Sequence, residues 1–155
     1  MDELSSKESG TYAMANEAKT SIIFRDLIRS KKYYDDTNIF IEEQKSDNTK
    51  INKLLKNASK KGEHMGFPDF IISSKIYPEL IIVVEAKADM NKHQSDAMNN
   101  YSDFAVDGAL LYASFLSKEY DVLAIGISGE SNDKKRISHF LNLKGEKKHT
   151  QYLVI

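Results

Sequence analysis

Residues 67–87 read FPDFIISSKIYPELIIVVEAK and contain the two strands that decide the fold. The run LIIVV at 80–84 is apolar at every position, which is typical of a central strand covered on both faces. Tyr77 and Pro78 lie between the two apolar runs, where a turn is expected. We predict strands at 67–73 and 79–87, paired as a hairpin centred near Tyr77.

Hydrophobic periodicity predicts three helices around this hairpin. The first runs from 16 to 30, with Asn16 as an N-cap, and the second from 48 to 61, ended by Gly62. The third is a long helical region at 93–116, bent near Gly108. The apolar positions of the first two helices are Ile23, Phe24, Leu27 and Ile28, then Ile51, Leu54, Leu55 and Ala58.

Further strands are expected at 38–43 and 121–128, and 137–143 and 151–155 are candidates for short strands. The predicted order is helix, strand, helix, strand, strand, helix, strand. That order indicates an α/β fold with a mixed sheet flanked by helices. Residues 1–15 are polar and non-periodic, and we expect a flexible leader there, followed by one domain at 16–155.

The composition is that of a soluble globular protein, with 41% hydrophobic and 29% charged residues among 155. The absence of cysteine excludes disulfides and thiolate zinc sites. The longest apolar run, 80–84, is too short to cross a bilayer, so we expect a cytoplasmic protein with no membrane contact. The formal net charge of −1 means that any DNA affinity must come from a local basic patch or an attached domain.

Three ionisable residues are expected to converge at one end of the hairpin. Glu85 and Lys87 are two positions apart on one strand, so their side chains point to the same face. The predicted pairing places Asp69, which follows Pro68, opposite Glu85. The other interpretation is that these are ordinary polar residues where a strand emerges into solvent.

This set of residues suits phosphodiester hydrolysis. Carboxylates such as Asp69 and Glu85 bind Mg²⁺, which Mn²⁺ commonly replaces, and the Ala86 carbonyl is a further candidate ligand. The metal withdraws charge from a phosphate and helps to ionise a water molecule. An ammonium such as that of Lys87 positions the attacking water and offsets charge in the transition state.

The strings GFPDFIIS, LIIVVEAKAD and KHQSDAMNNYSDFAVDGALLYASFLSKEYDVLAIGISG resemble nuclease domains of the PD-(D/E)xK kind. The chain is most similar to the N-terminal cleavage domains of type IIG restriction-modification enzymes, and more distantly to type I R-subunit nucleases. The resemblance covers 16–129. It implies Mg²⁺-dependent cleavage of double-stranded DNA, a restriction-endonuclease-like sheet, catalytic Asp69, Glu85 and Lys87, and a methyltransferase and recognition domains in a longer polypeptide.

The same resemblance extends to Glu17, which matches a metal-contacting glutamate in the first helix of such families. Helical spacing independently places Glu17 on the face that meets the sheet, although a partly exposed first-turn glutamate is an equal alternative. Related nucleases also carry a glutamine and a tyrosine on the following helix. Gln94 and Tyr101 are the candidates for substrate binding, but their spacing departs from the family pattern and favours core packing for Tyr101. His93 is expected at the surface.

Two lysine groups are candidate phosphate contacts, although a solvated surface explains them without any function and is the favoured interpretation. They are Lys50, Lys53, Lys56 and Lys60 opposite the apolar stripe of the second helix, and Lys134, Lys135 and Arg136 in a loop.

Three functions remain open from the sequence. The first is the cleavage module of a restriction-modification protein, which would dimerise on DNA to cut both strands. The second is a stand-alone repair or recombination nuclease. The third is a non-catalytic module that binds DNA or a partner.

Overall fold

The computed structural model describes residues 17–62 and 64–152, and its centre is a six-stranded mixed sheet. The strands lie in chain order across the sheet. Within these residues β3 and β4 pair in parallel, whereas every other neighbouring pair is antiparallel. The strands are β1 (Ile39–Glu42), β2 (Phe70–Ser74), β3 (Leu80–Lys87), β4 (Asp121–Gly129), β5 (Lys135–Asn142) and β6 (Thr150–Tyr152).

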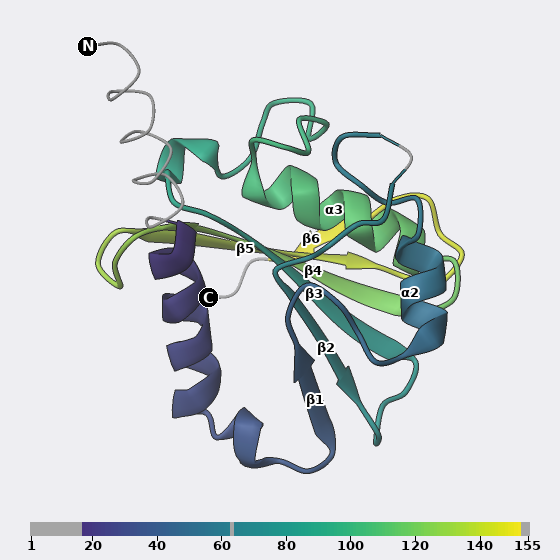
Figure 1. The fold of residues 1–155 in the computed structure, drawn as a ribbon. Helices are drawn as coiled ribbons and strands as arrows, with labels where there is room; N and C mark the ends of the chain where they lie inside the picture. The colour runs from purple at the N-terminus through teal and green to yellow at the C-terminus, as the bar shows by residue number, and fades with distance from the viewer. Residues whose placement is uncertain (1–16, 63, 153–155) are drawn as a thin grey trace, which may run out of the picture.

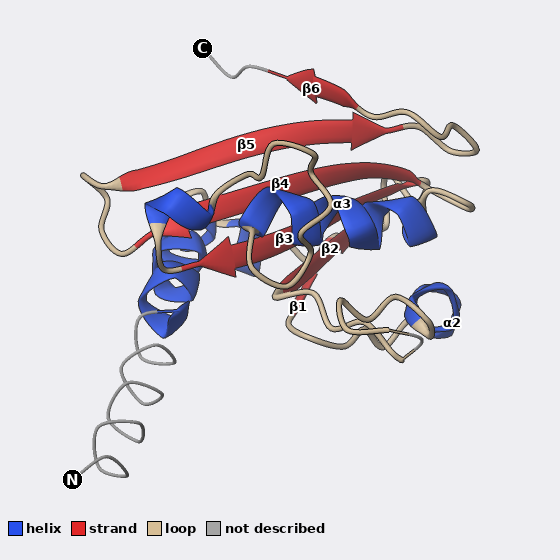
Figure 2. Cartoon of the chain, turned by 90° about the horizontal axis from the view of Figure 1, so that it is seen from above, coloured by secondary structure: helices blue, strands red, loops and turns tan. Residues whose placement is uncertain are grey.

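Helices cover both faces of the sheet (Figure 1). The helix α3 (Ala105–Leu116) packs on one face beside α2 (Thr49–Leu55), and the first helix, described over 17–30, lies on the other. Figure 2 shows α3 running along β3 and β4. Two short 3₁₀ helices, η1 (Tyr33–Asp35) and η2 (Met90–Lys92), lie in the connections. An α/β fold with a mixed sheet flanked by helices is therefore confirmed.

The central position of β3 follows from its apolar sequence. Ile81 and Val83 face α3, whereas Val84 and Ala86 face the first helix, so both surfaces of the strand are buried. The hairpin register pairs Phe70 with Val84, which centres the connection on Tyr77 as predicted. Because β3 is apolar on both faces, its hydrophobic pattern alone does not fix this register, and the short connection at Tyr77 sets it.

The second helix is shorter than predicted, because the prediction extended it to 61 and the structure ends it at Leu55. The Leu55 carbonyl accepts hydrogen bonds from the N–H groups of Ala58 and Gly66, which turns the chain back on itself. Gly62 does not end the helix. It has a φ of 131° and forms an isolated β-bridge with Ser59. Ala58 is fully buried, as its place in the apolar stripe predicted, but within this loop.

The third helix also differs, because only Ala105–Leu116 of the predicted 93–116 is helical. The buried Asp107 carboxylate accepts hydrogen bonds from the N–H groups of Ser95 and Asn100 and from the Ser95 hydroxyl. This network folds 93–104 into an irregular loop over the start of α3, in which Met98 has a φ of 53°. Gly108 lies in the first turns of α3 rather than at a bend between two helical halves.

The remaining differences concern element ends. β2 begins at Phe70 rather than at 67, since Pro68 has no N–H to give to a ladder. Lys135 and Arg136, predicted in a loop, lie in β5. The predicted leader at 1–15, Asn16, and the last strand beyond residue 152 lie outside the described residues. Among the helices that are described, none has the length and apolar content needed to cross a bilayer.

Candidate functional site

The fold brings Asp69 to the level of Glu85. Asp69 directly precedes β2, and the pairing of Phe70 with Val84 aligns it with the next residue of β3. One oxygen of Asp69 accepts the Ala86 N–H at 2.8 Å, and the other accepts the Gln44 side-chain amide at 3.3 Å. These two bonds hold the carboxylate beside the end of β3.

Pro68 gives the Ala86 backbone no ladder partner on the β2 side. If the register continued, Pro68 would lie opposite Ala86, but a proline has no N–H and its carbonyl accepts the Gln44 N–H at 3.0 Å. The N–H and C=O of one strand residue point to the same side. The Ala86 carbonyl therefore points towards Asp69 and receives no hydrogen bond from Pro68.

Glu85 is a buried acid with one unsatisfied oxygen. The residue is 2% exposed, its Oε1 lies 3.2 Å from the Lys60 ammonium, and its Oε2 has no hydrogen-bond partner among the described residues. Burial raises the pKa of Glu85 well above its ordinary value, the neighbouring Asp69 charge raises it further, and Lys60 acts in the opposite direction. A buried carboxylate in this position is costly unless further positive charge reaches it.

Helix α3 closes the site from above. A Cβ at Gly108 would lie 3.1 Å from Cγ of Glu85 and 3.0 Å from the Tyr101 carbonyl oxygen, so glycine permits this close approach. Tyr112, one turn further along α3, is 2% exposed. Burial raises the pKa of Tyr112, and the negative charges of Glu85 and Asp69 raise it further.

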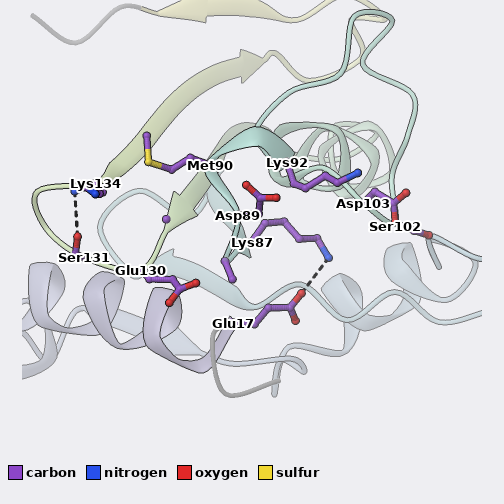
Figure 3. Close-up of a pocket in the computed structure, with 12 residues that line it drawn as sticks. Glu17, Lys87, Asp89, Met90, Lys92, Ser102, Asp103, Glu130, Ser131 and Lys134 are labelled. Atoms are coloured by element: carbon purple, nitrogen blue, oxygen red, sulfur yellow. Dashed lines mark hydrogen bonds and ion pairs between the residues drawn. The ribbon is translucent and has the colours of Figure 1, made fainter. Parts of the chain in front are cut away.

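Lys87 ends β3 and extends towards the first helix (Figure 3). Its ammonium lies 3.6 Å from Oε1 of Glu17, and the two side chains are 15% and 53% exposed. The Thr20 hydroxyl donates to the Gly129 carbonyl at 2.6 Å and lies 3.4 Å from the Lys87 carbonyl, which ties this helix to the ends of β3 and β4. Glu17 thus reaches the catalytic candidate Lys87, and it is partly exposed.

Two cavities adjoin at Lys87 and Ser102, which line both. The larger, of about 950 Å³, opens at the ends of β3 and β4, where Glu17, Lys92 and Lys134 are among its lining residues. The smaller, of about 310 Å³, is lined on its other side by the 59–67 loop and Tyr112. A ligand in either cavity would meet the Lys87 side chain.

The prediction that His93 lies at the surface is wrong. His93 is 1% exposed, and its two ring nitrogens lie 2.8 Å from the hydroxyls of Ser128 and Ser138. Burial, followed by the positive charge of Arg136, lowers the pKa of His93 to about 4. The imidazole therefore joins β4 and β5 to the loop after η2 as a neutral group.

The helical spacing used for Gln94 and Tyr101 is also wrong, because neither residue is helical. Gln94 is exposed in the 93–104 loop. Tyr101 is half-buried in a turn, with its carbonyl against Gly108. Their contact with substrate stays a prediction without its original geometric support.

Lys60 is the site residue that sequence reasoning missed. It was expected with Lys50, Lys53 and Lys56 on a solvated helix face, but the helix ends before it and the loop turns its ammonium to Glu85. Lys50 does remain at the surface, where it pairs with Glu119 at 3.5 Å. The Gly62 turn signal was present in the sequence, but its pattern could not show which way the loop folds.

Comparison with known proteins identifies no relative: no protein-family model, curated protein or solved structure matches the chain.

Asp69 and Glu85 bring two carboxylates together, short of the groups of three or more ligands that usually mark a metal site. Within 17–62 and 64–152 no group of three or more histidine, cysteine, aspartate or glutamate residues is arranged to hold a metal. Mg²⁺, however, usually takes one or two carboxylates and keeps several waters. Asp69, Glu85 with its unpartnered Oε2, and the Ala86 carbonyl supply oxygen ligands of this kind.

Proposed function

We propose that this chain is a Mg²⁺-dependent endonuclease that hydrolyses DNA phosphodiester bonds. The observation that carries the proposal is the buried Glu85, whose Oε2 lacks a partner among the described residues although Asp69 adds a second negative charge beside it. Structural carboxylates are normally satisfied by hydrogen bonds or exposed to water. An unsatisfied one next to another acid supports a role in binding a cation.

Asp69, Glu85 and the Ala86 carbonyl would hold Mg²⁺. When bound, the cation would polarise the scissile phosphate and help to ionise a water molecule. Asp69 is positioned for this role by the Ala86 N–H and Gln44, and Glu85 lies in the space that Gly108 leaves under α3.

Lys87 is proposed to act on the substrate. It lies two residues beyond Glu85 on the same strand face and lines both cavities, so a phosphate in either cavity is within its reach. Its ammonium would orient the attacking water and offset the negative charge that develops on the phosphate. Glu17 would hold this ammonium in place before substrate arrives.

The proposed context is the cleavage module of a restriction-modification protein acting on double-stranded DNA, with methyltransferase and recognition domains in the same polypeptide. The net charge of −1 supports sequence recognition by another part of the protein. Cutting both strands would then use two copies that dimerise on DNA. A stand-alone nuclease is the alternative within the same chemistry.

The test is plasmid cleavage by wild type, Asp69→Asn and Glu85→Gln over a Mg²⁺ and Mn²⁺ titration. Both variants should lose cleavage, because each removes a ligand charge, while in Asp69→Asn the amide oxygen can still accept the Ala86 N–H. Asp26→Asn is the matched control, since Asp26 is an exposed acid paired only with its helix neighbour Arg29 among the described residues.

Melting curves should show that all three variants are folded. Cleavage by Asp69→Asn or Glu85→Gln at the wild-type rate would contradict the assignment of the site. A wild type that binds DNA but never cleaves it would instead favour a non-catalytic binding module.

A further inference from the structure

The Lys60–Glu85 contact differs from the other ion pairs of the described chain. Its side chains are 21% and 3% exposed, whereas each of the other pairs has at least one partner more than one third exposed. Surface pairs contribute little, but a buried carboxylate depends strongly on its partner. The Lys60 ammonium is therefore an important source of positive charge for Glu85.

Hydrogen bonds within the loop and to a neighbouring loop hold the backbone of Lys60 near Glu85. Ser59 does not continue the helix; instead its N–H donates to the His64 carbonyl at 2.8 Å, and Ser59 and Gly62 form a bridge. The Lys60 carbonyl accepts the Ser102 hydroxyl at 3.4 Å from the loop before α3. Two loops thus meet over Glu85, and Lys61, the next residue, stays exposed.

Lys60 and a divalent cation would share the same two carboxylates as a source of negative charge. Asp69 and Glu85 carry two negative charges when both are ionised, and Lys60 neutralises one. A divalent cation on the same carboxylates would neutralise both. The ammonium bonded to Oε1 of Glu85 would then repel a cation bound at Oε2 of the same carboxylate.

The structure provides a place for the displaced ammonium. Lys60 also lines the 310 Å³ cavity that contains Lys87 and Ser102. A lysine side chain is a flexible four-carbon stem and is not tied to one direction. Its ammonium can leave Glu85 and enter this cavity, beside the lysine proposed to meet the phosphate.

We propose that Lys60 is a resident counter-ion of the metal site: it pairs with Glu85 in the metal-free protein, competes with the divalent cation for that carboxylate, and moves into the adjoining cavity when the cation binds. This inference rests on the proposed metal site. Lys60 would then weaken metal binding, whereas a residue that merely holds the site together would strengthen it.

The test is calorimetric titration of Mn²⁺ into the full chain, comparing wild type, Lys60→Gln and Lys60→Arg with the control Lys61→Gln. Lys60→Gln should bind Mn²⁺ about tenfold more tightly, which corresponds to about 1.4 kcal/mol. Lys60→Arg keeps the charge and should bind close to wild type, as should Lys61→Gln.

A metal-free melt gives the second expected result. Lys60→Gln should melt at a lower temperature than wild type without metal, and saturating Mn²⁺ should remove most of the difference. A merely structural lysine would instead lower the metal affinity, so unchanged or weaker Mn²⁺ binding by Lys60→Gln would overturn the inference.

A measurement on wild type keeps the inference testable if Lys60→Gln does not fold. Acetylation of Lys60, followed by peptide mass spectrometry, should become faster when Mn²⁺ saturates the site, whereas Lys61 should react at a constant rate. Slower or unchanged acetylation of Lys60 would overturn the inference. Wild type that binds Mn²⁺ but never cleaves DNA would overturn the proposed function alone, and wild type that binds no Mn²⁺ would overturn both.

Discussion

Gly108 offers a way to move Glu85 without changing any ionisable group. An alanine Cβ at this position would lie 3.1 Å from Cγ and 3.3 Å from Oε2 of Glu85, and 3.0 Å from the Tyr101 carbonyl oxygen. These contacts are tighter than a Cβ normally makes, so the neighbours must shift by a few tenths of an ångström. The Tyr101 side is backbone, and the Glu85 side chain is therefore expected to give way.

The two consequences of Gly108→Ala have separable magnitudes. A glycine inside a helix costs about 0.5–1 kcal/mol relative to alanine, so the gain in α3 should offset much of the strain and leave stability within about 1 kcal/mol of wild type. A misplacement of about 1 Å can cost about a hundredfold in rate. A shift of a few tenths of an ångström at Glu85 should therefore slow cleavage roughly four- to tenfold.

The assay is the initial rate of plasmid nicking at saturating Mg²⁺, with denaturant unfolding on the same preparations. Gly126→Ala is the comparison variant. Its Cβ would lie 2.7–2.9 Å from side-chain and backbone atoms of Val106, and the backbone atoms cannot move aside easily. Gly126→Ala should lose stability, whereas Gly108→Ala should lose rate. Full activity in Gly108→Ala would refute the claim that the position of Glu85 under α3 matters for cleavage.

Three further predictions concern single side chains. Lys87→Ala should lower the cleavage rate by about a hundredfold while calorimetry still detects Mn²⁺ binding. Lys87→Arg should not restore the full rate, because a planar guanidinium does not replace a compact ammonium. If Lys87→Ala cleaves within a few-fold of the wild-type rate, Lys87 is an ordinary lysine at the end of a strand. Glu17→Ala should slow cleavage less than Lys87→Ala, since it removes only the partner of that lysine. Rescue of the rate by raised Mg²⁺ would identify Glu17 as a metal contact. An unchanged rate at all metal concentrations would give Glu17 no part in the site. His93 should make the protein sensitive to acid, because burial lowers its pKa to about 4 in the folded state. As the pH falls from 6.5 towards 4, the unfolded state takes up a proton that the folded state does not. The free energy of unfolding should therefore fall by up to about 3 kcal/mol. Urea unfolding of His93→Gln across this pH range should lack that loss, and an equal slope in variant and wild type would contradict it.

Much of the strand framework was determined by the sequence alone. An unbroken apolar run can satisfy its side chains only between two covered faces, so 80–84 specified the central strand β3. The turn at Tyr77 then set the register that aligns Asp69 with Glu85. These are local rules of spacing, and they act over a few residues.

The ends of the helices and the surroundings of Glu85 were decided only by the tertiary structure. The periodicity of 48–61 and 93–116 is helical, yet carbonyl and carboxylate groups of Leu55 and Asp107 bind N–H groups from neighbouring loops and redirect the chain. Those partners are chosen by packing between segments distant in sequence. For the same reason the sequence could not place Lys60, 25 residues before Glu85, at its carboxylate. The sequence does not distinguish a lysine at the surface from one in a buried ion pair, because only the fold determines which charged groups are removed from water.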